Sequence, residues 1–323
     1  MTKGTTIPVF FAVDNRYVPY LAAALISLQT QANPADHYQI KILYQKQHLS
    51  LHNQHQLAAL IKPKTSVEFV ALDTGLWDKL GQDPNTLRAD YLTLTIYYRL
   101  FIANLFPQYE RGIYLDADVI INYDLGYLYR LNLHEQMIGA VTDAFISHHQ
   151  VTANYAEQAI GVPRNEYFNS GILLLDLKQM RACQLSQHFL YLMNKYHFPL
   201  IAPDQDYLNA IGHQRLFLLA DEWNLQTEYP LVTIKQPKIV HYNLYGKPWH
   251  YNNIAFQDLF WQALRQTPYY TQVKKEQQLY LNSPQKIQAD KDHKALLLKR
   301  VHDIPQQTPN FKTTAMQGEQ VQI

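Results

Sequence analysis

Residues 111–121 read RGIYLDADVII, a mostly apolar run that carries two aspartates. Such a run is typical of a strand buried in a parallel sheet, and we expect a single strand over the whole stretch. Asp116 and Asp118 then lie at the carboxyl end of a central strand, which is where open α/β sheets bind ligands. The stretch therefore predicts an α/β fold and the place of a functional site within it.

The residues on either side alternate between strand-like and helix-like segments. Before residue 111 we expect strands at 7–13, 38–44 and 66–72 and helices at 18–31, 48–61 and 92–105. After residue 121 we expect strands at 138–141, 171–176 and 216–219, helices at 177–196 and 204–211, and a polar, irregular loop or lid at 150–170. This βαβαβ order builds a parallel sheet with helices on its faces.

The composition argues against several classes of protein. The 323 residues include 28 basic and 27 acidic side chains, a net charge of +1, so we expect no binding of nucleic acid through phosphate neutralisation. Cys183 is the sole cysteine, which excludes an internal disulfide and a cysteine-based zinc cluster. The N-terminal residues lack the apolar stretch of a signal peptide, and no window of about 18 apolar residues could span a membrane. We expect a cytoplasmic protein.

Asp116 and Asp118 could hold a metal ion. Side chains at i and i+2 of an extended chain point to the same face, where two unpaired carboxylates repel each other and resist burial. A hard divalent cation removes that problem and can bridge a diphosphate. The alternative is a strand that ends at Leu115 and leaves both aspartates in solvent. His241 joined to the two carboxylates would complete a mixed oxygen and nitrogen site suited to Mn²⁺, and Lys247 could meet a phosphate as a point charge.

Two further polar stretches allow more than one interpretation. Asp204 opens a helix after Pro203, where it could cap the helix or recognise a sugar hydroxyl. Asn169 and Gly171 precede an apolar strand, where they could form a turn or let a ligand approach the backbone.

Six segments in this order resemble glycosyltransferase family 8, the galactosyl- and glucosyltransferases akin to bacterial lipopolysaccharide α-galactosyltransferases and glycogenin. The segments, within residues 7–250, are FFAVDNRYVPYL (10–21), YYRLFIANLF (97–106), RGIYLDADVIINYDL (111–125), EYFNSGILLLDLKQMR (166–181), APDQDYLNAI (202–211) and HYNLYGKPW (241–249). The resemblance implies a GT-A fold, with a mixed, mainly parallel central sheet flanked by helices. It also implies retaining transfer of a hexose from UDP-glucose or UDP-galactose to a saccharide, glycolipid or glycoprotein, dependent on Mn²⁺ or Mg²⁺.

The resemblance also implies a role for individual residues. The expected metal ligands are Asp116, Asp118 and His241; the expected nucleotide-sugar contacts are Val13, Asp14, Tyr17, Arg99, Ala117, Asp143, Asn169 and Lys247. Asp143, Asn169, Asp204 and Gln205 are expected to line the sugar pocket, with Gln205 nearest the anomeric carbon. Because an amide is a poor nucleophile, we favour front-face attack with Gln205 as a positioning group. Asp204 stays the rival candidate for a nucleophile.

Two residues depart from the family pattern. Arg16 stands where relatives often have asparagine, and Leu244 stands where they often have glycine, so the phosphate-binding loop could differ in shape. A catalytically inactive nucleotide-sugar- or carbohydrate-binding protein is the alternative reading; the presence of all three expected ligands favours an enzyme. No GxGxxG follows the first strand and no GxxxxGK[ST] occurs, so neither a Rossmann dehydrogenase nor a P-loop kinase is expected.

The C-terminal part differs in composition from the rest of the chain. We expect residues 1–282 to form the GT-A catalytic domain, 283–304 a basic amphipathic helix, and 305–323 a polar, poorly ordered tail. Residues 235–323 carry a net charge of +6, and Leu296–Leu298 are flanked by lysine and arginine. These features suit peripheral contact with an anionic membrane at its inner face; packing on the catalytic domain or an oligomer contact is the alternative.

Overall fold

Strand β1 (Thr6–Ala12) is buried over most of its length in the computed structural model, which describes residues 4–72, 94–229 and 233–323. It pairs in parallel with β2 (His37–Gln45) and with β4 (Arg111–Leu115), and β3 (Thr65–Leu72) lies beside β2. The apolar run of β1 reflects burial of both its faces, as is usual in parallel sheets. The strands predicted at 7–13, 38–44 and 66–72 are confirmed.

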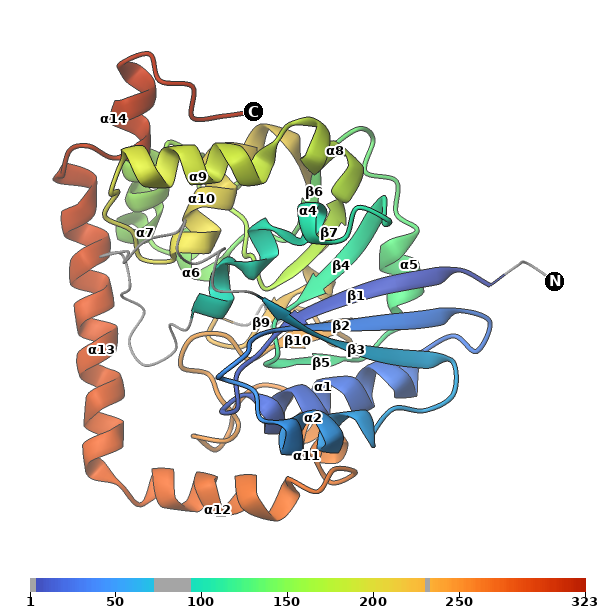
Figure 1. Cartoon of the computed structure of the whole chain (residues 1–323). Helices are drawn as coiled ribbons and strands as arrows, with labels where there is room; N and C mark the ends of the chain where they lie inside the picture. The colour runs from blue at the N-terminus through green and yellow to red at the C-terminus, as the bar shows by residue number, and fades with distance from the viewer. Residues whose placement is uncertain (1–3, 73–93, 230–232) are drawn as a thin grey trace. The chain divides into compact units, whose positions relative to one another are not determined.

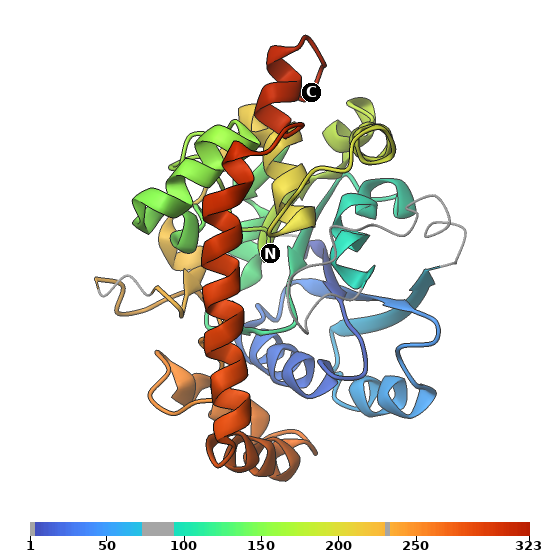
Figure 2. The ribbon, with the colours of Figure 1, turned by 90° about the vertical axis from the view of Figure 1, so that its left-hand side faces the viewer.

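The helices of this region follow the predicted alternation. Helix α1 (Val18–Gln31) is buried from Val18 to Leu28, in keeping with its apolar composition on every side, and Pro19 lies in its first turn. Helix α2 (Leu51–Ala58) begins after Ser50, whose hydroxyl accepts a hydrogen bond from Asn53 N. Both helices lie on the same face of β1, β2 and β3 (Figures 1 and 2).

The chain divides into two units. The first comprises Met1–Ala71, Gly112–Asn132 and Ala220–Lys291, and the second comprises Leu72–Arg111, Leu133–Leu219 and Asp292–Ile323. The first unit also contains α5 (Leu125–Tyr129), a 3₁₀ turn at Asp221–Trp223, α11 (Gln257–Leu264) and α12 (Tyr270–Leu281). Within the described ranges, none of the helices combines the length and apolar character needed to cross a membrane.

The prediction of one strand over 111–121 is wrong. The chain leaves β4 at Leu115 and enters β5 (Val119–Ile121), which belongs to a separate small sheet with β10 (Ile239–His241) and β9 (Leu225–Gln226). β10 is antiparallel to β5 and parallel to β9. Asp118 is held at this switch by its carbonyl oxygen, which accepts a hydrogen bond from Tyr242 N at 2.9 Å. The two aspartates therefore lie between strands, not inside one.

The second unit contains the remaining strands. β6 (Ile138–Ala140) is antiparallel to β7 (Ile172–Asp176) and parallel to β8 (Leu216–Leu218). Its described helical segments before residue 220 are a 3₁₀ helix at Leu94–Leu100, α4 (Ile102–Leu105), α6 (Ala144–His148), α7 (Gln150–Tyr155), a π-helix at Ala156–Ile160, α8 (Leu177–Ala182), α9 (Leu185–Lys195), α10 (Pro203–Gly212) and a 3₁₀ turn at His213–Arg215. With mixed, mainly parallel strands and flanking helices, the predicted α/β class is confirmed.

Two predicted helices are each interrupted. The helix expected at 177–196 is α8 and α9, because Gln184 adopts a left-handed conformation with φ +54°. Residues 92 and 93 of the helix expected at 92–105 lie outside the described residues, and the rest of it forms a 3₁₀ helix followed by α4. Its β-branched and aromatic residues favour the α-helix only weakly.

Two segments expected to be irregular are helical. Residues 150–160, predicted as loop or lid, form α7 and the π-helix, since Ala153, Tyr155 and Ile160 are buried apolar contacts. Residues 305–323, predicted to be poorly ordered, include the end of a 3₁₀ turn at Ile304–Gln306 and α14 (Phe311–Met316). The buried Phe311 and Val321 are the anchors that the polar composition hid.

Helix α13 (Pro284–Asp303) is one continuous helix after α12 (Figure 2). The boundary between the two units falls within it, at Lys291 and Asp292. Val301 is its buried residue, whereas Leu296 and Leu298 are exposed. A basic helix was predicted here; the boundaries of the three predicted domains stay a prediction.

Candidate active site

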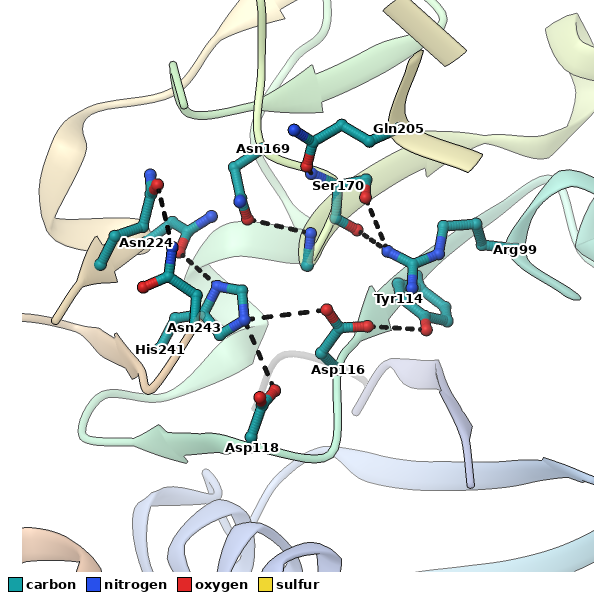
Figure 3. A network of polar contacts seen from close by, with 12 residues as sticks. Arg99, Tyr114, Asp116, Asp118, Asn169, Ser170, Gln205, Asn224, His241 and Asn243 are labelled. Atoms are coloured by element: carbon teal, nitrogen blue, oxygen red, sulfur yellow. Dashed lines mark hydrogen bonds and ion pairs between the residues drawn. The ribbon is translucent and has the colours of Figure 1, made fainter. Parts of the chain in front are cut away.

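Asp116, Asp118 and His241 converge in the first unit (Figure 3). One ligand atom from each lies within 4.8 Å of the others. His241 Nε2 is 3.4 Å from Asp118 Oδ1 and 3.7 Å from Asp116 Oδ2. Although the strand ends at Leu115, as in the alternative interpretation, the carboxylates are not both in solvent: Asp118 is buried and Asp116 is about one quarter exposed. The end of β4, the start of β5 and the end of β10 bring these side chains together.

Neighbouring side chains fix the orientation of the three groups. His241 Nδ1 donates to Asn224 Oδ1 at 3.2 Å, which turns Nε2 toward the two carboxylates. Tyr114 donates its hydroxyl to Asp116 Oδ1 at 2.9 Å and leaves Oδ2 on the side of His241. Two carboxylates and one imidazole are a donor set that suits a divalent cation. The residues present therefore fit a metal ion.

Lys247 forms an ion pair with Asp118, and both side chains are buried. Burial by itself raises the pKa of Asp118, but the charge of Lys247 and the hydrogen bond from His241 outweigh it and hold that pKa well below its ordinary value. With one lysine opposite two carboxylates, the cluster keeps a net negative charge that a dication could offset. Lys247 also lies 5.5 Å from the ring centre of Trp249.

The loop that carries Lys247 has a tight backbone. Leu244, which stands where relatives often have glycine, adopts φ +50°, a conformation that favours glycine. A Cβ at Gly246 would lie 2.9 Å from Thr227 Oγ1, so glycine is required there. Trp249 stacks on Tyr20 of α1 with ring centres 3.8 Å apart, which anchors the end of the loop. The departure at Leu244 thus keeps the turn and places a side chain in it.

The predicted nucleotide contacts after β1 are also in the first unit. Asp14 is buried and accepts three hydrogen bonds from Arg16: from its backbone N at 2.9 Å, Nε at 3.1 Å and Nη2 at 2.9 Å. Arg16, the other departure from the family pattern, therefore engages the carboxylate of Asp14, which we expected to contact the nucleotide. Val13 is buried, and Tyr17 is half-buried with its ring edge-on to Tyr20.

Arg99 and Asp204 form a buried ion pair in the second unit, with Nε and Oδ2 3.0 Å apart. Ser170 links the two: its carbonyl oxygen and hydroxyl accept from Arg99 Nη1 at 2.5 and 2.8 Å, and its hydroxyl donates to Asp204 Oδ2 at 3.2 Å. Asp204 therefore engages an arginine, not the helix end. The backbone N–H groups of Ile201 and Ala202 are instead bonded by Asp206 Oδ2.

Asp143, Asn169 and Gln205 form a second buried group in the same unit. Asp143 Oδ2 accepts from Asn169 Nδ2 at 2.9 Å and from Gln205 Nε2 at 3.1 Å, while Oδ1 caps α6 through Ile146 N. Asn169 Oδ1 accepts from Gly171 N at 3.0 Å, so this stretch is a side-chain-stabilised turn (Figure 3). The four predicted sugar-pocket residues are thus joined by direct bonds or through Ser170.

No role was predicted from the sequence for several residues of these arrangements. Tyr114 and Asn224 orient the candidate ligands, but an isolated tyrosine in a strand and an isolated asparagine in a turn carry no pattern. Ser170 lies between Asn169 and Gly171, both singled out from the sequence, and this position could have indicated that it belongs to the site. Ala117, between the two aspartates, is buried.

Comparisons with known proteins identify relatives of this chain. Residues 8–253 match the family model described as glycosyl transferase family 8. General stress protein A of Bacillus subtilis is 25% identical over 273 residues, covering 78% of this chain and 90% of that protein. The lipopolysaccharide 1,2-glucosyltransferase of Escherichia coli is 27% identical over 168 residues, covering 48% of this chain and 49% of that protein.

A crystal structure of the galactosyltransferase LgtC with donor and acceptor sugar analogs has the same fold. The TM-score is 0.70 at 21% identity, and the match covers 88% of this chain and 100% of that one. The GT-A fold predicted from the sequence is therefore confirmed. With three quarters of its length matched by the family model, the chain belongs to glycosyl transferase family 8.

Proposed function

We propose that this protein is a metal-dependent, retaining hexosyltransferase that moves glucose or galactose from a UDP-sugar to a saccharide or glycoconjugate acceptor. The observation that carries the proposal is the cluster of Asp116, Asp118 and His241, with Lys247 paired to Asp118. Membership of glycosyl transferase family 8 supports a nucleotide-sugar donor and a separate acceptor.

Asp116, Asp118 and His241 would hold the metal, which we propose is Mn²⁺, with Mg²⁺ as the alternative. A divalent cation supplies Lewis-acid stabilisation of the charge on a departing diphosphate. Lys247 adds a fixed positive charge from the protein itself. Because Lys247 is buried and already oriented, it need not reorganise as charge develops on the leaving UDP. Asp14 and Tyr17 are the proposed uridine contacts.

In the transfer itself, the acceptor hydroxyl oxygen bonds to the anomeric carbon while the bond from that carbon to the UDP oxygen breaks. The hydroxyl proton passes to UDP, and attack from the leaving-group side retains the configuration. Asp204 is a poor candidate for a nucleophile, since Arg99 and Ser170 already engage its carboxylate. This supports front-face attack, with Gln205 and Asp143 holding the sugar and Arg99 contacting the donor.

The acceptor and the cellular location are further proposals, each supported by an observation of its own. One relative is a lipopolysaccharide glucosyltransferase, which supports a cell-envelope saccharide as acceptor. We propose that the protein works in the cytoplasm, at the inner face of the membrane, and that the lysines of α13 contribute to this location.

A panel of UDP-sugars tests the function. Release of UDP is measured with a mixture of saccharide acceptors, with Mn²⁺, with Mg²⁺ and with EDTA. We expect one UDP-hexose to be preferred, turnover to stop in EDTA, and the anomeric proton coupling of the fresh product to report an α linkage. Binding of UDP-sugar without turnover would favour the alternative of an inactive binding protein, and a β linkage would exclude retention.

A further inference from the structure

Asp206 is a fully buried carboxylate beside Gln205, and no role has been assigned to it so far. Its Oδ1 accepts from the Tyr167 hydroxyl at 2.5 Å, and its Oδ2 accepts from the Tyr155 hydroxyl at 2.9 Å. Oδ2 also accepts from the backbone N atoms of Ile201 and Ala202 at 3.2 and 2.9 Å. Four donors therefore hold this carboxylate in one orientation.

Tyr167 connects Asp206 to Gln205. The Tyr167 hydroxyl donates to Asp206 and accepts from Gln205 Nε2 at 3.3 Å. The second N–H of the same amide donates to Asp143, and Gln205 Oε1 accepts from Ser170 N at 2.9 Å. The amide thus has a fixed direction, with its oxygen toward Ser170 and its nitrogen toward Tyr167.

We propose that Tyr167 and Asp206 are positioning residues that set the amide orientation of Gln205 for sugar transfer. The inference rests on the proposed function of this site. A carboxylate can only accept, so it forces the Tyr167 proton toward itself and leaves the hydroxyl oxygen to accept from the amide nitrogen. If this acceptor were lost, Asp143 would be the remaining acceptor for the amide nitrogen, and the amide could tilt away from its present orientation.

Two further observations agree with a fixed relay. Burial, followed by the charge of Asp206, raises the pKa of Tyr155 and Tyr167 well above the ordinary value, so both hydroxyls keep their protons. Asn209 donates to the carbonyl oxygens of Phe168 and Gln205, each at 2.9 Å, and accepts from Phe168 N, which ties the segment of Tyr167 to α10. Asp206 itself is enclosed and is not placed to attack a sugar.

Tyr155 provides a matched control. Tyr155→Phe and Tyr167→Phe each remove one buried hydroxyl from the same carboxylate, but Tyr167 alone of the two bonds Gln205. We expect Tyr167→Phe to lower kcat at least about tenfold with a change in donor KM of less than about threefold. Tyr155→Phe should keep kcat within about threefold of wild type. Equal losses in the two variants, or no loss in Tyr167→Phe, would overturn the proposal.

One further variant and crystal structures of the phenylalanine variants provide two more tests of the relay. Asp206→Asn keeps the shape of the side chain but removes the charge that orients the Tyr167 hydroxyl; it should lower kcat, and unchanged kcat counts against the relay. If the wild-type protein releases no UDP from any UDP-sugar, the proposed function fails. Crystal structures of the two phenylalanine variants then decide the relay: the Gln205 amide should move in Tyr167→Phe only, and an unmoved amide in both contradicts it.

Discussion

His241 Nε2 lies 3.4 Å from Oδ1 of Asp118, while the other carboxylate oxygen of Asp118 pairs with Lys247. The buried carboxylate of Asp118 therefore contacts both His241, another candidate metal ligand, and Lys247, the candidate phosphate-binding residue. Asp116 is the more exposed of the two aspartates, with about one quarter of its side chain accessible. The two aspartates should therefore differ in what they contribute to folding.

Asp118→Ala should cost roughly 3–5 kcal/mol of unfolding free energy, because it leaves the buried Lys247 without its partner. Asp116→Ala should cost less, about 1–3 kcal/mol, because it removes an acceptor of the buried Tyr114 hydroxyl. Both should lose transfer activity. The double variant Asp118→Ala/Lys247→Met should regain most of the stability and none of the activity. Urea unfolding followed by tryptophan fluorescence measures the stability of each variant, and UDP release measures its transfer activity. A double variant as unstable as Asp118→Ala would contradict the pairing.

UDP should bind more tightly with Mn²⁺ than without metal, and His241→Ala should remove most of that difference. The reason is that a metal held by His241 and the two aspartates couples these side chains to the diphosphate. Titration calorimetry with UDP, in the presence and absence of metal, gives both affinities. His52→Ala, at an exposed position on α2, is the matched control and should behave as wild type. Equal affinities in the wild-type protein would reject metal bridging.

His250 should make the fold sensitive to mild acid. Burial, then the charges of Lys247 and Lys286, lower the pKa of His250 to about 3. Because the unfolded chain takes up this proton near pH 6.5 and the folded protein does not, stability falls as the pH drops below 6.5. The contribution lost between pH 6.5 and pH 5 is roughly 2 kcal/mol.

His250→Phe provides the test, since a phenyl ring can keep the stack on Tyr280, where the ring centres are 3.8 Å apart. The difference in unfolding free energy between wild type and variant should change with pH in the acid range. A difference that stays constant from pH 7 to pH 5 would show that His250 takes up its proton in the folded state as well.

Much of the fold could be predicted because its main elements are buried on every side. β1 and α1 are apolar over most of their length, so their sequences allow few other structures. The failures occurred where a tertiary contact overrides composition. Residues 305–323 are polar on average, but Phe311 and Val321 are buried. The strand through Asp116 and Asp118 could not be divided from sequence alone, because residues on both sides of the break are equally apolar.

The candidate site was predictable as a set of residues and not as a network. Asp116, Asp118 and His241 converge as expected, although His241 lies 123 positions after Asp118. The pairing of Arg99 with Asp204 was not foreseen, since either residue could have met a ligand alone. Tyr167 and Asp206 were present in the quoted segments, but a tyrosine and an aspartate 39 residues apart give no sign of a hydrogen bond.

The C-terminal segment should prove necessary for folding. Phe311 is buried, with its ring centre 4.2 Å from that of Phe198 and 5.0 Å from that of Tyr207. The carbonyl oxygen of Val321 lies 2.9 Å from His188 Nε2, and Arg300 Nη2 donates to Leu200 O at 2.9 Å. These contacts favour packing over the alternative of a dispensable membrane tether. A chain ending at Gln285 should therefore melt far earlier than the full chain or be insoluble.

Two single substitutions in α14 test the same point without truncation. Phe311→Ala should lower the unfolding free energy by roughly 3–5 kcal/mol, the usual cost of removing a buried aromatic ring. Met316→Ala, in the same helix but 78% exposed, should change it by less than about 0.5 kcal/mol. If both variants are as stable as wild type, the segment contributes nothing to the core.

Contact with an anionic membrane can still be tested, because Lys291 and Lys299 of α13 are exposed while Phe311 packs in the core. Lys291 and Lys299 are exposed, and Lys294 is half-buried. Each basic residue near an anionic surface contributes about 1 kcal/mol, so changing all three to glutamine should abolish weak, salt-sensitive binding to vesicles containing phosphatidylserine. The triple variant should keep the melting temperature and UDP release of wild type, since Arg300 and Phe311 still hold the segment in place. Vesicle binding that survives the triple change, or that is insensitive to salt, would show that the lysines are not the attachment.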